Sequence, residues 1–153
     1  MELMLRRGTD RDAGPLGELY LRARKAAIPI IPMTAHTDDE VRAWIAELVI
    51  PRTEVWVAES EGGDLVGLLV LDDEWVDQLY VEPGLTGRGI GTRLIELAKR
   101  RRPDGLRLWT FESNIGAQRF YERHDFRATD RTEDDNEEGV PDILYVWDED
   151  SSR

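Results

Sequence analysis

The sequence predicts an α/β fold formed by one domain of residues 1–153. Short runs rich in Val, Leu, Ile and Trp alternate with segments whose apolar residues recur at helical spacing. The length of 153 residues suits one domain, and no internal repeat or linker divides the chain. A glycine-rich loop, Pro83 to Gly91, also joins a strand-like run to a helix-like one, as in α/β units that bind phosphate.

The first part of the chain is expected to form a strand and a helix. Leu3 to Arg7 is a candidate strand, and the polar groups of Thr9 to Asp12 can cap the helix that follows. Four apolar residues should lie on one face of that helix: Leu16, Leu19, Tyr20 and Ala23. The prolines of Ile28 to Pro32 should end it, because proline removes a backbone donor and restricts the preceding residue.

A second helix and a hairpin should follow. Thr37 to Glu40 has the pattern of a capping box. The apolar residues behind it recur at helical spacing: Val41, Trp44, Ile45 and Leu48. Pro51 is expected to end this helix. Glu54 to Ser60 and Leu65 to Leu71 predict two strands, which the Gly62-Gly63 turn would join as a hairpin.

The second half of the chain alternates strands and helices. The expected strands are Trp75 to Val81, Leu106 to Phe111, Phe126 to Asp130 and Ile143 to Trp147. The expected helices follow the glycine loop, with Ile90, Leu94, Leu97 and Ala98 on one face, and span Asn114 to His124. Trp56, Trp109 and Trp147 fall within strands and are expected to be core residues.

Composition excludes several classes of function. The net charge of −12 argues against sequence-independent binding of nucleic acid, which needs a basic surface. There are no cysteines, so disulfides, thiolate metal sites and a cysteine nucleophile are excluded. The two histidines, His36 and His124, lack the spacing of metal ligands, so no metal is expected. No apolar run is long enough to span a bilayer and none resembles a signal peptide, so we expect a cytoplasmic protein without membrane contacts.

The glycine loop predicts an anion site. Glycines between a strand and a helix start let backbone N–H groups approach a pyrophosphate, and the helix dipole adds partial positive charge. A Walker-type loop is disfavoured because no lysine follows Gly89 or Gly91. A dinucleotide fingerprint is disfavoured as well, because Gly87, Gly89 and Gly91 bring the third glycine one position early.

Two motifs carry a resemblance to a known family. The loop Thr86-Gly87-Arg88-Gly89-Ile90-Gly91 resembles the pyrophosphate loop of the GNAT acetyltransferase superfamily, [Q/R]-x-x-G-x-[G/A], with Thr86 as a departure at the first position. Asn114 to Phe126 resembles the family motif N-x-x-A-x-x-F-Y-E-x-x-G-F, with Asp125 in place of glycine. Aspartate tolerates the left-handed conformation that such a position requires. The order of elements along nearly the whole chain is also similar to the GNAT order.

The resemblance implies a fold and a cofactor site. It implies a mixed, splayed sheet of about seven strands with about four helices, in a three-layer arrangement. Acetyl-CoA would lie between Trp75–Val81 and Leu106–Phe111, with its pantetheine arm along the backbone of Leu79, Tyr80 and Val81. The remaining residues implied to bind it lie in the loop and the second motif: Thr86, Gly87, Arg88, Gly89, Ile90, Gly91, Thr92, Asn114, Ala117, Phe120 and Tyr121.

The resemblance also implies the chemistry. An N–H near Leu79 would polarise the thioester carbonyl, and Tyr121 would protonate the leaving thiolate. Asp77, a carboxylate within an otherwise apolar strand, is our candidate general base, since burial would raise its pKa. Glu112 and a water chain are the alternatives.

The resulting hypothesis is an acetyl-CoA-dependent N-acetyltransferase that acetylates a primary amine of a small molecule or peptide by direct transfer. The segment Pro29 to Met33 and the acidic loop Glu133 to Pro141 would shape the acceptor site, and His36 would border it. A non-catalytic acyl-CoA-binding sensor module is the alternative, and a ligand-free interaction domain is a third reading. Relatives commonly form homodimers, but nothing in the residues requires one.

Overall fold

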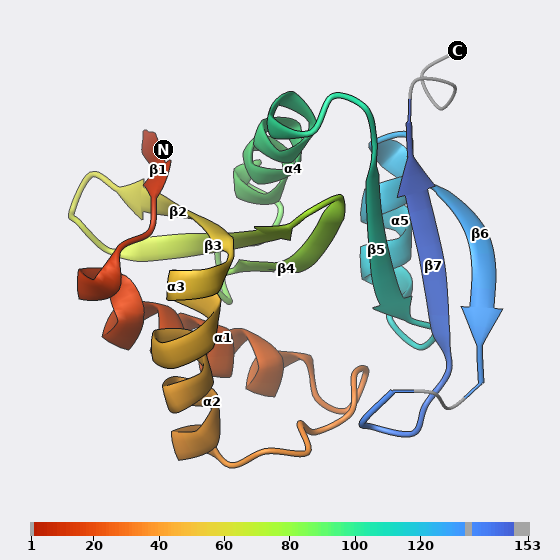
Figure 1. Ribbon diagram of the computed structural model, residues 1–153, viewed down its shortest axis with the longest axis horizontal. Coiled ribbons are helices and arrows are strands. Elements are labelled where there is room, and N and C mark those ends of the chain that lie inside the picture. Colours follow the sequence, from red (N-terminus) through yellow and green to blue (C-terminus); the bar gives the residue numbers. More distant parts are fainter. Residues whose placement is uncertain (1, 134–135, 149–153) are drawn as a thin grey trace.

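A computed structural model describes residues 2–133 and 136–148 of the chain. The protein forms an α/β fold around one seven-stranded sheet in the order β1-β2-β3-β4-β5-β7-β6 (Figure 1). The strands are β1 (Leu3–Arg7), β2 (Glu54–Ser60), β3 (Leu65–Asp72), β4 (Trp75–Val81), β5 (Leu106–Phe111), β6 (Arg127–Thr132) and β7 (Asp142–Trp147). Only the pair β4–β5 is parallel, so the predicted α/β class and mixed sheet are confirmed.

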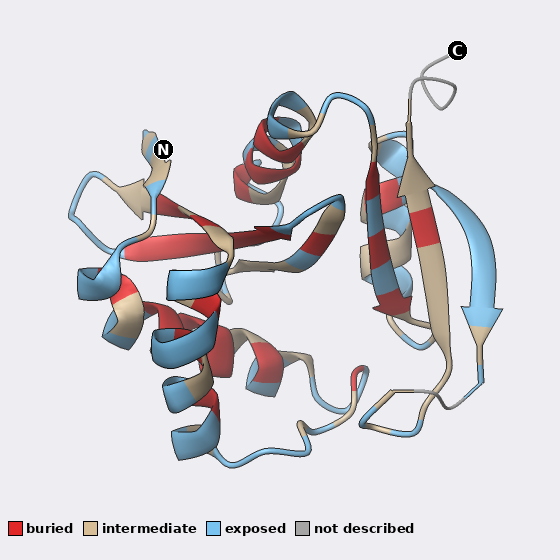
Figure 2. Cartoon of the chain, viewed as in Figure 1, coloured by how far each residue is buried: buried red, intermediate tan, exposed pale blue. Residues whose placement is uncertain are grey.

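Helices cover the two faces of this sheet unequally. They are α1 (Ala13–Ala27), α2 (Asp38–Trp44), α3 (Ile50–Arg52), α4 (Ile90–Arg101) and α5 (Ile115–Arg123). α1 to α3 lie on one face of β1–β4 and α4 on the other, while α5 backs β5 and β7 (Figure 1). The buried residues follow the faces that meet the sheet, and β3 is buried along almost its whole length (Figure 2).

Two apolar clusters fill the layers. One lies between the sheet and α4 and α5, and it includes Leu69 of β3 as well as Leu108 of β5 and Tyr145 of β7. The other lies beneath α1 and α2 and joins them to β2 and β3. The first cluster therefore spans both halves of the sheet, whereas the second stays within the β1–β4 half.

The second helix starts where the sequence predicts and ends later. Thr37 and Glu40 form the predicted capping box, with the Glu40 N–H donating to Thr37 Oγ1 at 3.1 Å. The helix then widens through a π turn at Ile45–Val49 and continues as α3 to Arg52. The sequence predicted that Pro51 would end this helix, and that prediction is wrong. The wide π turn before Pro51 accommodates a residue that has no backbone N–H to donate.

The central feature of the fold is that β4 and β5 diverge. Gln78 of β4 pairs with Val70 of β3 and Val76 pairs with Leu71, so Asp77 is an extra residue that bulges from the ladder. Bulges bend a strand and increase its local twist. Within the described residues, the only register pair between β4 and β5 is Trp75 with Arg107, so the strands separate beyond it.

Glycine at position 67 lets α4 pack close to β3. A Cβ added there would lie 2.9 Å from Leu94 Cδ1 and 3.1 Å from Ile90 Cγ2, both on α4. Since such distances are shorter than ordinary contacts, any side chain would push the first turns of α4 away from the sheet. Gly67 thus fixes the position of the helix that follows the glycine loop.

The last strands depart slightly from the sequence expectation. β6 begins at Arg127 rather than Phe126, whose side chain is buried in the core just before the strand. Trp109 was expected to be core but is 42% exposed, because β5 carries it on the face that α5 does not cover. It stacks on Trp75, with ring centroids 6.5 Å apart. Asp125 has φ 71°, so it supplies the predicted left-handed residue after α5.

Asp12 ties the first strand to the first helix. Its buried carboxylate accepts hydrogen bonds from Arg6 Nη1 at 2.9 Å, Arg6 Nη2 at 3.0 Å and the Thr9 N–H at 2.8 Å. The hydrogen bond from Arg6, with those from Thr9, lowers the pKa of Asp12 despite its partial desolvation. The ionised form is therefore the one that stabilises the folded protein.

We predict that Asp12→Asn lowers the free energy of unfolding by about 1–3 kcal/mol at pH 7, because Arg6 loses its bidentate partner. Since the folded-state pKa is lowered, the stabilisation is present above the ordinary aspartate pKa of about 3.9 and is lost as the pH falls through the folded value. Urea unfolding of both proteins at pH 7 and pH 2.5 checks this. Asp10→Asn, in the same turn and exposed, is the control; an equal gap at both pH values would contradict the prediction.

Candidate functional site

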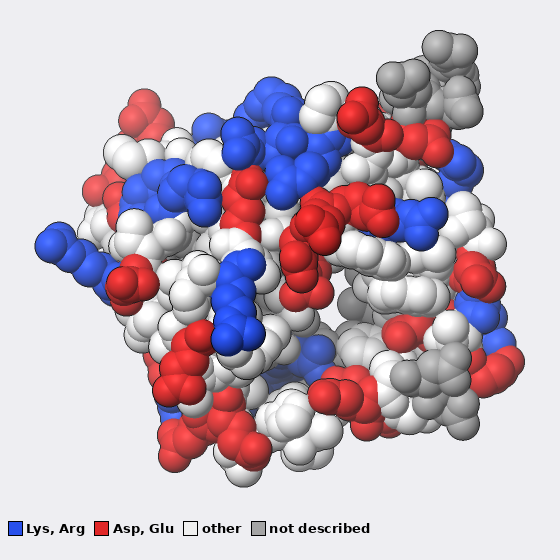
Figure 3. Space-filling model, in the orientation of Figure 1, with Lys and Arg blue, Asp and Glu red and all other residues white. Residues whose placement is uncertain are grey.

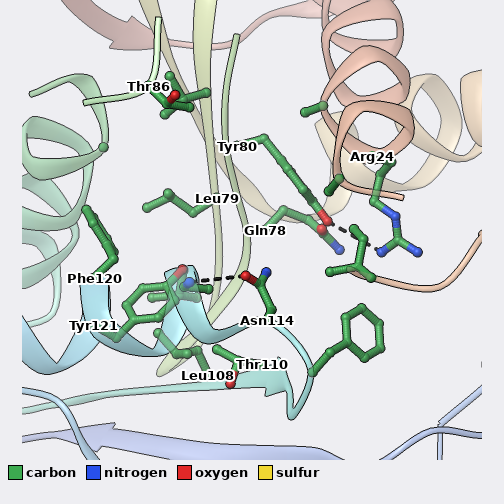
Figure 4. A pocket seen from close by; sticks show the side chains of 18 of the residues that line it. Arg24, Gln78, Leu79, Tyr80, Thr86, Leu108, Thr110, Asn114, Phe120 and Tyr121 are labelled. Carbon is green, nitrogen blue, oxygen red and sulfur yellow. Dashed lines mark hydrogen bonds between the residues drawn. The ribbon is translucent and has the colours of Figure 1, made fainter. Parts of the chain in front are cut away.

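A cavity of about 820 Å³ opens where β4 and β5 diverge. β4 lines it on one side, with β5 and α5 opposite and α1 at one end (Figure 4). The glycine loop and the first turn of α4 form another wall. Because β4 has no strand partner beyond Trp75 on this edge among residues 2–133 and 136–148, its backbone N–H and C=O groups there are left for a ligand or water to satisfy.

The glycine loop presents its backbone N–H groups to this cavity. Gly84, Gly87 and Gly89 have φ of 89°, 79° and 84°, a left-handed conformation that favours glycine. Within the described part of the chain, no N–H of residues 87–92 has a hydrogen-bond acceptor, and the ladder of α4 begins with Arg93 N–H to Gly89 O at 3.1 Å. Consecutive free N–H groups at a helix N-terminus form a site that suits a phosphate.

The structure brings together nearly all of the sequence-predicted residues. The cavity walls include Asp77, Leu79, Tyr80, Val81, Thr86, Gly87, Gly89, Ile90, Gly91, Thr92, Asn114, Ala117, Phe120 and Tyr121. Arg88 is exposed and is not among them. The two motifs also touch each other, because a Cβ at Gly91 would lie 3.2 Å from the ring of Phe120.

Tyr121 is held on the inner face of α5. Asn114 caps this helix, its Oδ1 accepting from the Ala117 N–H at 3.1 Å, which fixes the first turn (Figure 4). The Tyr121 ring lies between Phe120 and Phe126, at centroid distances of 5.1 and 5.5 Å. Burial, and to a smaller extent the neighbouring Tyr80, raises the pKa of Tyr121, so its phenol remains a proton donor at neutral pH.

Asp77 lies at the bulge and borders the same cavity. Its side chain has accessible surface, since it faces the cavity, but the protein atoms around it still displace much of the bulk water. This desolvation raises its pKa, and the charge of Asp72 raises it further. A carboxylate in this environment accepts protons more readily than an ordinary aspartate does.

Three other residues considered from the sequence do not line the cavity: Glu112, His36 and His124. Glu112 pairs with Arg131 at 2.7 Å and does not line the cavity. His36 binds Glu137 at 2.9 Å, also outside the lining residues. His124 is not a simple exposed residue: it packs 4.7 Å from the Phe120 ring, and its Nε2 lies 3.2 Å from Thr92 Oγ1. No group of three potential ligands that could hold a metal ion occurs in the described residues.

Sequence reasoning missed the two buried polar residues of the cavity wall, Arg24 and Thr110. Arg24 lies on the apolar stripe of α1, four residues after Tyr20, and it is buried. A charged residue at an apolar helical position was the signal that could have revealed it. Thr110 of β5 is also buried, and its Oγ1 has no hydrogen-bond partner among the described residues. No pattern in the sequence distinguishes that threonine from an ordinary strand residue.

Charge is divided around the hollow. Lys and Arg side chains gather over α4, while Asp and Glu side chains lie over the β3–β4 turn beside the hollow (Figure 3). Asp134 and Asp135 of the acidic loop lie outside the described residues. Within the described ranges, no helix is long and apolar enough to cross a membrane.

Comparison with known sequences identifies the family. Residues 51–128 match the acetyltransferase (GNAT) domain, and this span contains β4, the glycine loop and α5. The peptidyl-lysine N-acetyltransferase YjaB of Salmonella typhimurium is 37% identical over 98 residues, covering 62% of this chain and 67% of that protein. YjaB of Escherichia coli is 28% identical over 138 residues, covering 89% of this chain and 90% of that protein.

Solved structures agree with the sequence comparison. The solution structure of apo-form YjaB from Escherichia coli has a TM-score of 0.77 and 26% identity, covering 96% of this chain and 98% of that one. The PaiA N-acetyltransferase of Thermoplasma acidophilum, in complex with coenzyme A, has the same fold, with a TM-score of 0.70 at 19% identity over 97% of this chain and 99% of that one. The chain therefore belongs to the GNAT superfamily of acetyltransferases.

Proposed function

We propose that the chain is one GNAT-like domain that transfers an acetyl group from acetyl-CoA directly to a primary amine. The observation that carries the proposal is the row of N–H groups at residues 87–92 that have no acceptor among the described residues; all of these residues except Arg88 line the cavity between β4 and β5. Such a row suits a pyrophosphate, and the cavity beside it can hold an extended arm. With no cysteine in the chain, an acetyl-cysteine intermediate is excluded, which favours direct transfer in a ternary complex.

The cavity residues fit acetyl-CoA in three respects. The N–H groups of the loop and the first turn of α4 would hold the pyrophosphate. The free edge of β4 at Leu79 to Val81 would pair with the amides of the pantetheine arm, as an added strand would. Thr110 Oγ1, buried without a partner among the described residues, would supply a further polar contact on the β5 side.

The transfer step follows from the same geometry. The amine attacks the thioester carbonyl, and the oxygen gains negative charge that an N–H near Leu79 would stabilise. The oxyanion then re-forms the carbonyl, the C–S bond breaks, its electron pair leaves on sulfur, and the new amide nitrogen releases its extra proton, which balances the one given to sulfur. Tyr121, kept protonated by burial, would donate its proton to that thiolate. The amine must first lose its own proton, and Asp77, with its raised pKa, is the residue proposed to take it.

The acceptor is proposed to be an amine on a small molecule or a peptide. The YjaB relatives are named peptidyl-lysine N-acetyltransferases, which favours a lysine side chain within a peptide. The acidic side chains over the β3–β4 turn would attract a cationic amine toward the hollow (Figure 3).

Replacement of Gly89 should weaken cofactor binding. Gly89 has φ 84°, so an added side chain strains the backbone by about 1–2 kcal/mol and favours loop conformations that turn the N–H groups away. Gly89→Ala should therefore raise the Kd for coenzyme A about tenfold in calorimetric titration. Gly62→Ala is the matched control, since its Cβ would meet nothing within 4 Å and its φ is not left-handed. Equal Kd values for both variants would argue against the loop as the cofactor site.

Removal of the Tyr121 hydroxyl should slow turnover. Tyr121→Phe should lower kcat about 100-fold with little change in coenzyme A affinity, because the thiolate loses its proton donor. Thiol release with an amine acceptor measures this. Tyr145→Phe provides the control: its hydroxyl binds Glu122 at 2.8 Å and does not line the cavity. If the two variants lost activity equally, the tyrosine would be acting through packing alone.

Loss of the Asp77 carboxylate should matter most near neutral pH. Asp77→Asn is expected to lower kcat about 100-fold at pH 7, where the acceptor amine is protonated. The deficit should shrink as the pH approaches the amine pKa of about 10, since solution then removes the proton. A pH profile of kcat for both proteins tests this, with Asp64→Asn as a surface control. A deficit independent of pH would exclude Asp77 as the general base.

A further inference from the structure

Arg24 is a buried cation with poor pairing. Its side chain is 9% exposed, and its contacts are long: 3.5 Å to Tyr80 Oη, 3.3 Å to the Pro32 carbonyl oxygen and 3.5 Å to Glu138 Oε1. The Nε–H has no partner within the described part of the chain. A buried charge is costly unless it is well paired. The Arg24 guanidinium can therefore bind an anionic group of a ligand more strongly than it binds its present partners within the protein.

The same chain shows what a structural pair looks like. Asp12 accepts two hydrogen bonds from Arg6 at 2.9 and 3.0 Å, the bidentate geometry in which arginine binds carboxylates most strongly. Glu138 instead approaches Arg24 through one oxygen at the limit of hydrogen bonding. The Nη groups of Arg24 therefore remain able to donate hydrogen bonds to a second carboxylate.

Arg24 lies where an acceptor would bind. It lines the cavity from α1, and the Tyr80 side chain extends from β4 toward it (Figure 4). Its guanidinium lies 5.6 Å from the Phe111 ring of β5, so it closes the gap between the two strands at this end. Tyr121 lies across the cavity on α5, with Tyr80 and Gln78 of β4 between them in the view of Figure 4. This position places Arg24 beside the amine rather than beside the glycine loop.

The groups around Arg24 match a zwitterion. Glu138 and Asp142 line the same part of the wall, and Asp77 borders the cavity from β4. Asn136 fixes their loop, with Nδ2 donating to Asp142 Oδ2 at 2.7 Å and to the Val140 carbonyl oxygen at 2.6 Å. A single cation among carboxylates can hold an anionic group of a ligand while the carboxylates attract its ammonium group.

We propose that the acceptor carries a carboxylate close to the reacting amine, and that Arg24 binds this carboxylate. This inference rests on the proposed acetyltransferase function and specifies its substrate class. The carboxylate belongs either to a free amino acid or to an acidic side chain next to a lysine in a peptide; the chemistry is the same in both. Arg24 is a binding and specificity residue here, whereas the proton transfers belong to other groups.

The test compares acceptors that differ only in the carboxylate. One pair is lysine and lysinamide, and the other is a short peptide with Lys-Glu and its Lys-Gln counterpart. Thiol release from acetyl-CoA gives kcat/KM for wild type, Arg24→Gln and Lys25→Gln; Lys25 is the adjacent, exposed cation that pairs with Asp38. Comparing the ratio within each pair across variants removes any difference in amine pKa between the two acceptors.

In wild type, the carboxylate acceptor of at least one pair should be preferred about tenfold or more in kcat/KM, the magnitude of a charge-assisted bond. Arg24→Gln should abolish most of this preference, and Lys25→Gln should keep it. The pair that shows the preference identifies the source of the carboxylate. Glu138→Gln, which removes the competing carboxylate and retains Arg24, should increase the preference and so tests the proposal even if Arg24→Gln fails to fold.

Three results would overturn the proposal while leaving the enzyme intact. The first is turnover of both members of each pair at equal kcat/KM by wild type. The second is a preference that survives Arg24→Gln, and the third is a preference that Glu138→Gln leaves unchanged. A uniform fall with Arg24→Gln on charged and neutral acceptors would assign this arginine a purely structural role. No turnover on any acceptor would instead contradict the proposed function itself.

Discussion

The separation of two parallel strands is the constraint on which the rest of this structure depends. Beyond Trp75, the edge of β4 has no register partner in β5 among the described residues, although both strands are central in the sheet. Each backbone group left without a partner in a buried setting costs about 1–3 kcal/mol unless water or a ligand satisfies it. The glycine loop, α4 and α5 all border the resulting gap. The site therefore lies at an interruption of the sheet, and these elements form its remaining walls.

The two sides of this gap are held together differently. On the α4 and α5 side, one apolar cluster runs from Leu69 of β3 to Leu108 of β5 and is continuous across the two halves. On the α1 and α2 side, the apolar cluster ends at β4, and the bridging contacts given for described residues are polar. They include Arg24 with Glu138, His36 with Glu137, and the hydroxyl of Ser113 with the Ile30 carbonyl oxygen. Apolar packing therefore joins the two halves on the first side, whereas polar contacts join them on the second.

Local patterns predicted most of the fold and much of the site. Periodicity and caps predicted the seven strands and the helices α1, α2, α4 and α5, because capping boxes and prolines act over a few residues. Gly84, Gly87, Gly89 and Asp125 were interpretable because a left-handed backbone limits the choice of residue. The bulge at Asp77, the π turn before Pro51 and the exposure of Trp109 were not predictable, as each depends on the partner across the sheet or helix layer. Arg24 was missed because its acidic partner, Glu138, lies in a loop more than a hundred residues later in the sequence.

The extra residue at position 77 also limits where the chain can lose a residue without losing the cavity. β3 and β4 are joined by a short turn, so their registers on either side of the bulge are fixed relative to each other. Deleting one residue between Val76 and Gln78 would restore a regular ladder in which Val76 still pairs with Leu71 and Gln78 with Val70, so the bulge would be lost although the pairs beyond it stay the same. A substitution there alters one side chain, whereas a deletion would remove the bend that opens the sheet. We infer that relatives which keep the cavity can carry a different residue at position 77 but must keep one residue there, without a deletion.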